Sequence, residues 1–130
     1  MADITKINVN FKSNFSGELC ANSGNYQVGE NGIRPYEMLL GSLAGCLYAT
    51  FLDVLDSKKL KIEQGSFEII GEKREEIPTT LKTVNIVFKV KCDEINQKQI
   101  RTSFEISKKY CSVYHTISKV ADINTELIYI

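Results

Sequence analysis

The sequence predicts an α+β protein built from an antiparallel-rich sheet with helices on one face. Three observations support this fold class: short alternating strands at the start of the chain, one long apolar helix in the middle, and a second half in which strands and helices do not alternate strictly. The chain has 130 residues, a length that fits one domain with a sizeable core. We therefore expect residues 1–130 to form a single domain.

The first part of the chain is predicted to form a small antiparallel meander. Apolar and polar residues mix regularly from Ile4 to Phe11, which indicates a strand. Asn, Ser and Gly then mark two turns, at residues 14–17 and 23–25. The remaining strands of the meander are expected at residues 18–22 and 26–28.

Residues from Pro35 to about Lys58 are predicted to form one long helix. Proline is tolerated in a first helical turn, because its missing N–H would have no partner there. Glu37 would then lie near the positive end of the helix dipole, where a carboxylate is stabilising. The apolar run that follows supplies the length of the helix.

Two stripes along this helix predict burial on two sides. The small side chains of Ser42, Gly45 and Ala49 form one stripe, which would let another helix approach closely. Cys46 points into the other stripe, where a free cysteine is most often a small hydrophobic residue. At about 100° per residue, this apolar stripe consists of Leu39, Leu43, Cys46, Thr50 and Val54, with Leu47 at its edge.

The second half of the chain is predicted to hold three strands, a long helix and a short one. The clearest strand runs from Leu81 to Cys92, where apolar and polar residues alternate. A helix capped by Asp93 or Glu94 should continue to about Lys109. Its expected core residues are Ile95, Ile100, Phe104 and Ile106. The other expected elements are a strand at 62–73, a charged loop at 74–80, a turn and short helix at 110–117, and a final strand at 121–130.

Charge and composition exclude several classes of function. Lys and Arg number 16 and Asp and Glu number 16, so the formal net charge is zero. That balance argues against a nucleic-acid or anionic-membrane binder. The N-terminus has no signal-peptide core, and the uncharged run from Met38 to Leu52 is shorter than the about 20 residues of a membrane span. We expect a cytoplasmic protein that binds neither nucleic acid nor membrane.

The four cysteines are Cys20, Cys46, Cys92 and Cys111. None forms a Cys-x-x-Cys pair and the chain has one histidine, so no metal or other cofactor is expected. In a reducing compartment, paired cysteines would cycle rather than serve as a static crosslink. Cys46 in the central helix and Cys111 just past the second long helix are the candidates for chemistry. A thiolate of lowered pKa can attack a peroxide, and a second thiol can resolve the oxidised product.

The residues around these two cysteines resemble the two motifs of the OsmC/Ohr family, the osmotically inducible protein C and organic hydroperoxide resistance proteins. Residues 35–46 read PYEMLLGSLAGC, similar to the family signature Pro-x-Glu-Leu-Leu-Leu-x-x-Leu-x-x-Cys. Residues 111–117 read CSVYHTI, similar to Cys-Pro-Val-x-x-Thr-Leu. The order of elements also agrees, so the resemblance covers nearly the whole chain.

The resemblance implies an OsmC-like fold, with antiparallel sheets and a long central cysteine-bearing helix, assembled as an interleaved homodimer with two interfacial active sites. By this resemblance, Cys46 would attack the peroxide and Cys111 would resolve the oxidised sulfur. Glu37 matches the family's site glutamate; it lies on the opposite side of its helix from Cys46, so it would serve the partner chain's site. An organic hydroperoxide would be the substrate, and an external thiol or dithiol the reductant.

The chain departs from the family pattern at two places. The family's peroxidases hold the thiolate with an arginine from the N-terminal strands, whereas Arg34, next to Pro35, is the one arginine before Glu37. Arg34 is therefore the candidate for this role, because Lys12 lacks the guanidinium fork. Ser112 replaces the usual proline after the second cysteine.

Two functional hypotheses follow, with a third interpretation behind them. The first is a thiol-dependent peroxidase that reduces organic hydroperoxides in oxidative stress defence. The alternative is a catalytically weak OsmC-like protein that binds a small molecule or senses redox state, which the missing strand arginine favours. In the third, both cysteines are ordinary core residues, and both motif matches would be accidents.

Overall fold

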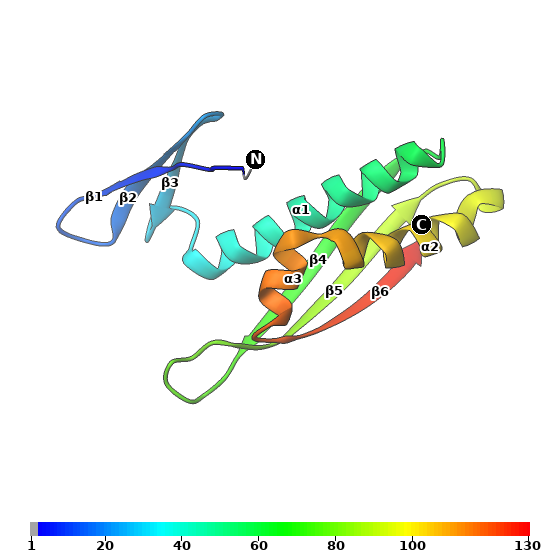
Figure 1. Ribbon diagram of the computed structural model, residues 1–130. Helices are drawn as coiled ribbons and strands as arrows, with labels where there is room; N and C mark the ends of the chain where they lie inside the picture. Colours follow the sequence, from blue (N-terminus) through cyan, green and yellow to red (C-terminus); the bar gives the residue numbers. More distant parts are fainter. Residues whose placement is uncertain (1–2) are drawn as a thin grey trace. The chain divides into compact units, whose positions relative to one another are not determined.

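The computed structural model describes residues 3–130. The chain divides into two compact units, one up to Leu39 and the other from Leu40 onward. Each unit has its own three-stranded sheet, β1-β2-β3 in the first and β4-β5-β6 in the second (Figure 1). The α+β class predicted from the sequence is therefore correct.

The first unit contains the predicted meander. Its strands are β1 (Asn8–Phe11), β2 (Ser16–Ala21) and β3 (Gly24–Gly29), and both pairings are antiparallel. β1 begins later than expected because its partner strand is short. Asn8 pairs with Cys20, and β2 ends one residue further on, at Ala21. Ile4, which was expected to start the strand, is 93% exposed. Ser16 and Gly17, predicted to lie in a turn, instead begin β2.

Gly17 is in that strand because a neighbouring ring comes very close to its backbone. A Cβ atom at residue 17 would lie 2.6 Å from the ring of Phe11, its cross-strand partner. That distance is too short for any side chain. The sequence predicts a turn here, but Gly17 lies in a strand, where its missing side chain leaves room for the Phe11 ring.

Helix α1 (Pro35–Ser57) confirms the predicted helix to within one residue. Its end is a Schellman motif: Leu60 N–H donates to the Leu55 carbonyl and Lys59 N–H donates to the Asp56 carbonyl. Lys59 takes the left-handed position of that motif, with φ 57°. The position usually belongs to glycine, so a lysine there does not mark the end of a helix clearly in the sequence.

The second sheet consists of β4 (Gln64–Lys73), β5 (Leu81–Lys91) and β6 (Asp122–Tyr129), in that spatial order. β4 and β5 pair antiparallel, whereas β5 and β6 pair parallel. The sheets are thus antiparallel-rich, as predicted, and the β5–β6 pairing is the exception to the expectation of antiparallel sheets. The physical reason is the connection: helices lie between β5 and β6, and a helical crossover returns the chain in the same direction.

That crossover contains a 3₁₀ turn η1 (Glu94–Asn96), helix α2 (Gln97–Tyr110) and helix α3 (Ser112–Ser118). In the second unit, α1, α2 and α3 cover one face of the β4–β6 sheet (Figure 1). Ile100 and Phe104 are buried as predicted, but Ile95 is 88% exposed because it lies in η1, before α2 begins. The predicted cap at Asp93 makes no side-chain capping hydrogen bond.

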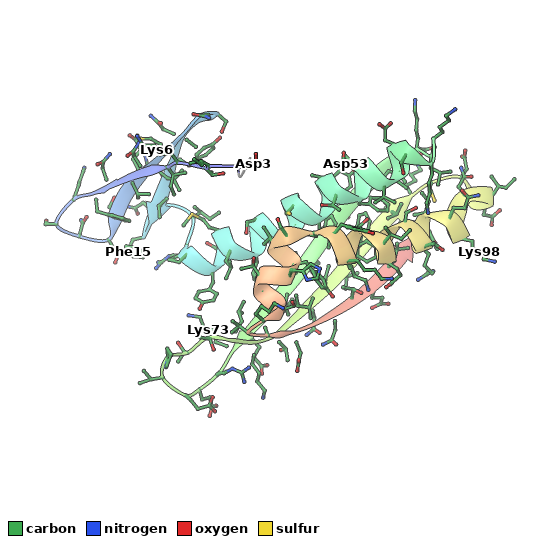
Figure 2. All side chains as sticks on the ribbon, viewed as in Figure 1. Asp3, Lys6, Phe15, Asp53, Lys73 and Lys98 are labelled. Atoms are coloured by element: carbon green, nitrogen blue, oxygen red, sulfur yellow. The ribbon has the colours of Figure 1, made fainter. Side chains whose placement is uncertain are left out.

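An aromatic cluster forms the core between the helices and the sheet. The Phe88 ring stacks on Phe67 at 4.3 Å between ring centroids, and it meets Phe51 at 5.1 Å and Phe104 at 5.0 Å. Side chains fill the space between helices and sheet in this unit, while charged residues such as Lys73 and Lys98 project away from it (Figure 2).

The buried face of α1 is turned from the predicted stripe, and the two share Leu43. Four residues at a spacing of four face the sheet: Leu43, Leu47, Phe51 and Leu55. Leu47, placed at the edge by the sequence, is at the centre because the aromatic core lies under that side. Ser42, Gly45 and Ala49 are exposed on this chain, and a Cβ at Gly45 would meet nothing within 4 Å.

By length and composition, α1 is also able to cross a membrane. The uncharged run from Met38 to Leu52, on which the expectation of no membrane span is based, is only part of this helix. The whole helix has 23 residues and is long and apolar enough to cross a membrane. The core helix of a soluble protein passes the same test, so this is weak support for a membrane protein.

Candidate functional site

The two candidate cysteines come from elements that pack against each other in the second unit. Cys46 lies in α1 and is half-buried, whereas Cys111 joins α2 to α3 and is fully buried. Cys111 interrupts the helical run because its backbone is extended, with φ −75° and ψ 114°. Its sulfur caps α3 by accepting the Tyr114 N–H at 3.4 Å.

The start of α3 surrounds the Cys46 sulfur with hydrogen-bonding groups. The Ser112 Oγ lies 3.7 Å from the Cys46 Sγ. Hydrogen bonding between the Cys46 and Cys111 thiols also influences the pKa of each, and both cysteines are free rather than disulfide-bonded. Two thiols separated by most of the second unit's sequence are thus near enough to influence each other.

Opposing effects set the pKa of Cys46. Burial by itself raises it, but a hydrogen bond from the Val113 backbone, the Cys111 thiol, and the hydroxyl and backbone of Ser112 lower it. The net result is a pKa below that of an ordinary thiol. Cys46 is therefore the more readily ionised of the pair, as a nucleophile must be.

The pKa of Cys111 moves the other way, to about 11. Burial is the main cause; the Tyr114 backbone hydrogen bond opposes it, and the hydrogen bond and charge of Cys46 add to it. At neutral pH Cys111 is thus a protonated thiol that can donate to a Cys46 thiolate. Cys46 is thus suited to act as a nucleophile, whereas Cys111 stays protonated and can react in a later step.

Arg34 and Glu37, the other predicted site residues, belong to the first unit. The Arg34 backbone N–H donates to Glu37 Oε1 at 2.8 Å, the reciprocal half of a capping box at the start of α1. The Arg34 guanidinium carbon lies 5.8 Å from the centroid of the Phe15 ring. Within this unit, both residues thus stabilise the junction between the meander and the helix.

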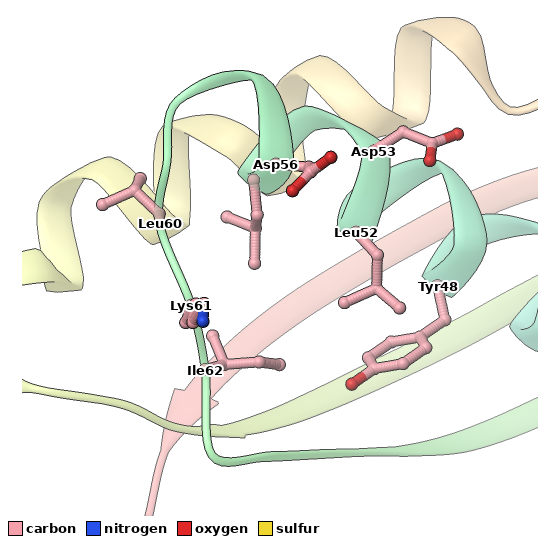
Figure 3. Close-up of a pocket in the computed structure, with 8 residues that line it drawn as sticks. Tyr48, Leu52, Asp53, Asp56, Leu60, Lys61 and Ile62 are labelled. Atoms are coloured by element: carbon pink, nitrogen blue, oxygen red, sulfur yellow. The ribbon is translucent and has the colours of Figure 1, made fainter.

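The second unit has a pocket of about 400 Å³ beside the C-terminal half of α1, away from the cysteines. Figure 3 shows Tyr48 and Leu52 pointing from α1 towards Ile62. Neither cysteine lines it, so the thiol pair and this pocket are separate features. Among residues 3–130, no group of three or more His, Cys, Asp or Glu side chains is placed to hold a metal ion.

Sequence reasoning missed the contributions of Ser112 and Val113 to this site. The signal was present, because a serine stands where the family motif has proline. Proline has no N–H and no hydroxyl, so the replacement adds two donors at a position beside Cys46. The sequence alone did not show that these donors face the sulfur.

A family model described as OsmC-like protein matches residues 28–126. The fold is similar to an OsmC-like protein from Mycoplasma pneumoniae, with TM-score 0.84, 17% identity, and 100% and 99% of the two chains covered. It is also similar to a hypothetical protein from Aquifex aeolicus VF5, with TM-score 0.83, 21% identity, and 99% of each chain covered.

A third solved structure is an organic hydroperoxide resistance protein from Elizabethkingia anophelis, with TM-score 0.75, 12% identity and 100% of each chain covered. At these identities the likeness establishes the fold. No curated protein matches the sequence.

Proposed function

The chain belongs to the OsmC-like protein family, and from this premise we propose that it is a thiol-dependent peroxidase that reduces organic hydroperoxides. The observation that carries the proposal is that two neighbouring free thiols, which influence each other, have pKa values displaced in opposite directions, Cys46 downward and Cys111 upward. Such a pair supplies an attacking thiolate and a protonated resolving thiol at the same pH. The organic hydroperoxide resistance protein that shares this fold supports the choice of substrate.

In the first step the Cys46 thiolate attacks the terminal oxygen of the hydroperoxide. An S–O bond forms, the O–O bond breaks, and the substrate leaves as an alkoxide that takes a proton to become an alcohol. The Cys46 sulfur, now a sulfenic acid, has been oxidised by two electrons and the peroxide reduced by two. Lowering the pKa of Cys46 favours this step because the thiolate, not the thiol, is the nucleophile.

In the second step Cys111 resolves the sulfenic acid. Its sulfur attacks the Cys46 sulfur, an S–S bond forms, and the sulfenic oxygen leaves as water with the Cys111 proton. An external dithiol then reduces the disulfide and is itself oxidised to a disulfide, which restores both thiols. A monothiol would do the same in two exchanges.

A specific observation favours the second candidate, a catalytically weak protein that binds a small molecule or senses redox state. Among the described residues, the groups that lower the Cys46 pKa are all hydrogen-bond donors, and no cationic side chain is among them. Within the first unit, Arg34 lies over the Phe15 ring. A site without a cation beside the thiolate would react more slowly with peroxide.

The proposal is tested by titrating the reduced protein with one equivalent of an organic hydroperoxide per chain. We expect two of the four free thiols to disappear within the mixing time of a manual assay. A Cys46–Cys111 disulfide should appear in the peptide map, and an equal dose of hydrogen peroxide should react more slowly. Loss of thiols over hours would instead support the weak binder or sensor.

Cys111→Ser is the matched control for this titration. It removes the resolving thiol, so one thiol per chain should be lost and the Cys46 sulfenic acid should persist long enough to be trapped by dimedone. If Cys111→Ser still loses two thiols rapidly, Cys111 is not the resolving residue. Cys20 or Cys92, which are also free, would then be the partner to examine.

We further propose that the protein works in the cytoplasm as an interleaved homodimer of single domains, with Arg34 and Glu37 contributing to a site shared by two chains. The exposed small side chains of Ser42, Gly45 and Ala49 support this assembly, since they leave α1 open to a second helix. An exposed stripe of this kind on an apolar helix is typical of a close helix–helix interface.

Gly45→Leu is expected to shift the dimer to monomer. A leucine would hold two α1 helices apart, although it meets nothing within 4 Å in a single chain. Light scattering coupled to size exclusion measures the mass. Thr102→Leu, at an exposed position of α2, is the control and should remain dimeric. A wild-type protein that runs as a monomer at micromolar concentration would contradict the assembly.

A further inference from the structure

Ser112 has a hydroxyl that α3 does not use for its own cap. Serine at the start of a helix ordinarily accepts a backbone N–H from the first turn. Here Cys111 occupies the cap position, and its sulfur accepts the Tyr114 N–H. Ser112 follows as the first residue of α3, and its hydroxyl is directed to the Cys46 sulfur at 3.7 Å.

The chemistry of this contact depends on the charge of Cys46. A neutral thiol is a weak hydrogen-bond partner, whereas a thiolate is a strong acceptor and cannot donate. The Ser112 hydroxyl can rotate to point its proton at the sulfur, so the contact strengthens when Cys46 ionises. A donor with this behaviour stabilises the reactive form selectively, as a nearby cation would.

We propose that Ser112 is a positioning residue that helps to hold and orient the Cys46 thiolate in this protein, through a hydrogen bond from its hydroxyl to the Cys46 Sγ. The biological role of this hydrogen bond rests on the proposed peroxidase function. Its effect on the reactivity of Cys46 does not, and that effect can be measured without a peroxide.

Three variants of Ser112 separate its hydroxyl from its backbone. Ser112→Ala removes the hydroxyl and keeps the N–H, while Ser112→Thr keeps both. Ser112→Pro removes both, and it restores the family motif at a position where proline is tolerated, the first residue of a helix. The extended backbone of Cys111 also suits a residue that precedes proline.

The experiment measures the rate at which iodoacetamide alkylates Cys46 in the reduced full-length protein between pH 5 and pH 10, by mass spectrometry of the Cys46 peptide. At pH 7 Ser112→Ala should react about twofold to tenfold more slowly than wild type, the effect of losing one hydrogen bond of ordinary strength. Ser112→Pro should be slower still, and Ser112→Thr should match wild type. Circular dichroism melts verify that each variant is folded.

Ser118→Ala is the matched control, because Ser118 is an exposed serine of the same helix whose hydroxyl donates to the His115 carbonyl. It should leave the alkylation profile of Cys46 unchanged. Equal rates in wild type, Ser112→Ala and Ser112→Pro would overturn the proposal. Equal rates in wild type and Ser112→Ala with a slow Ser112→Pro would also overturn it, because the backbone N–H would then be the effective donor.

The same variants separate this inference from the proposed function. Hydroperoxide consumption, measured in parallel, should fall by the same factor as alkylation. If the protein consumes no hydroperoxide but Ser112→Ala still slows alkylation, the peroxidase proposal fails and the role of Ser112 stands. If consumption is rapid and neither consumption nor alkylation changes in Ser112→Ala and Ser112→Pro, the peroxidase proposal stands and the role of Ser112 fails.

Discussion

Cys46→Ser should abolish hydroperoxide turnover, with a loss of about a thousandfold or more, the scale on which removal of a nucleophile acts in enzymes. The serine hydroxyl does not ionise near neutral pH and is a far weaker nucleophile than a thiolate. The measurement is consumption of an organic hydroperoxide in the presence of excess dithiol. The substitution is nearly isosteric at a half-buried position, so the fold should persist.

Cys92→Ser is the control for this prediction. Cys92 is also a half-buried free thiol, but burial and the charges of Asp93 and Glu63 raise its pKa, so it stays protonated at neutral pH. Its loss should leave turnover at the wild-type level. A Cys46→Ser protein that consumes hydroperoxide as fast as wild type would remove the peroxidase proposal.

Phe88→Ala should produce the largest loss of stability, about 3–5 kcal/mol in the free energy of unfolding. Phe88 is completely buried, and its ring is in contact with rings from α1, α2 and β4. Truncation removes the ring that α1, α2 and β4 all contact, and it leaves a cavity that these elements cannot fill by small shifts. Urea unfolding followed by circular dichroism measures the change, at one protein concentration because subunit association would add to stability.

Ile70→Ala is the comparison for Phe88→Ala. Ile70 lies on β4, the neighbouring strand of the same sheet, and is 58% exposed. Its truncation should change stability by no more than about 0.5 kcal/mol. Similar effects of the two substitutions would show that the aromatic cluster is not the core of this unit.

The pattern of the sequence was enough to predict most of the elements. The alternation along β5 predicted both its position and its buried face, and Val84, Ile86, Phe88 and Val90 are all buried. Pro35 correctly marked the start of α1. Proline suits a first helical turn because its missing N–H has no partner there, and this depends only on the local backbone. The α+β class followed from the order of these elements.

The failures have a common physical cause, which is that they depend on packing between distant segments. The buried face of α1 was misplaced because the aromatic core under Leu47 is formed by β4, β5 and α2. The parallel pairing of β5 with β6 depends on where the crossover helices lie. Neither the packing under Leu47 nor the position of the crossover helices can be inferred from local periodicity.

By itself the sequence determined the order and kind of the elements, the central helix, and the two cysteines as the candidates for chemistry, because each of these follows from local pattern or from a motif. Only the tertiary structure decided that the Cys46 and Cys111 thiols are neighbours and that Ser112 faces the Cys46 sulfur. Hydrogen bonds reach only about 3 to 4 Å, so which groups share one is decided by how the helices pack.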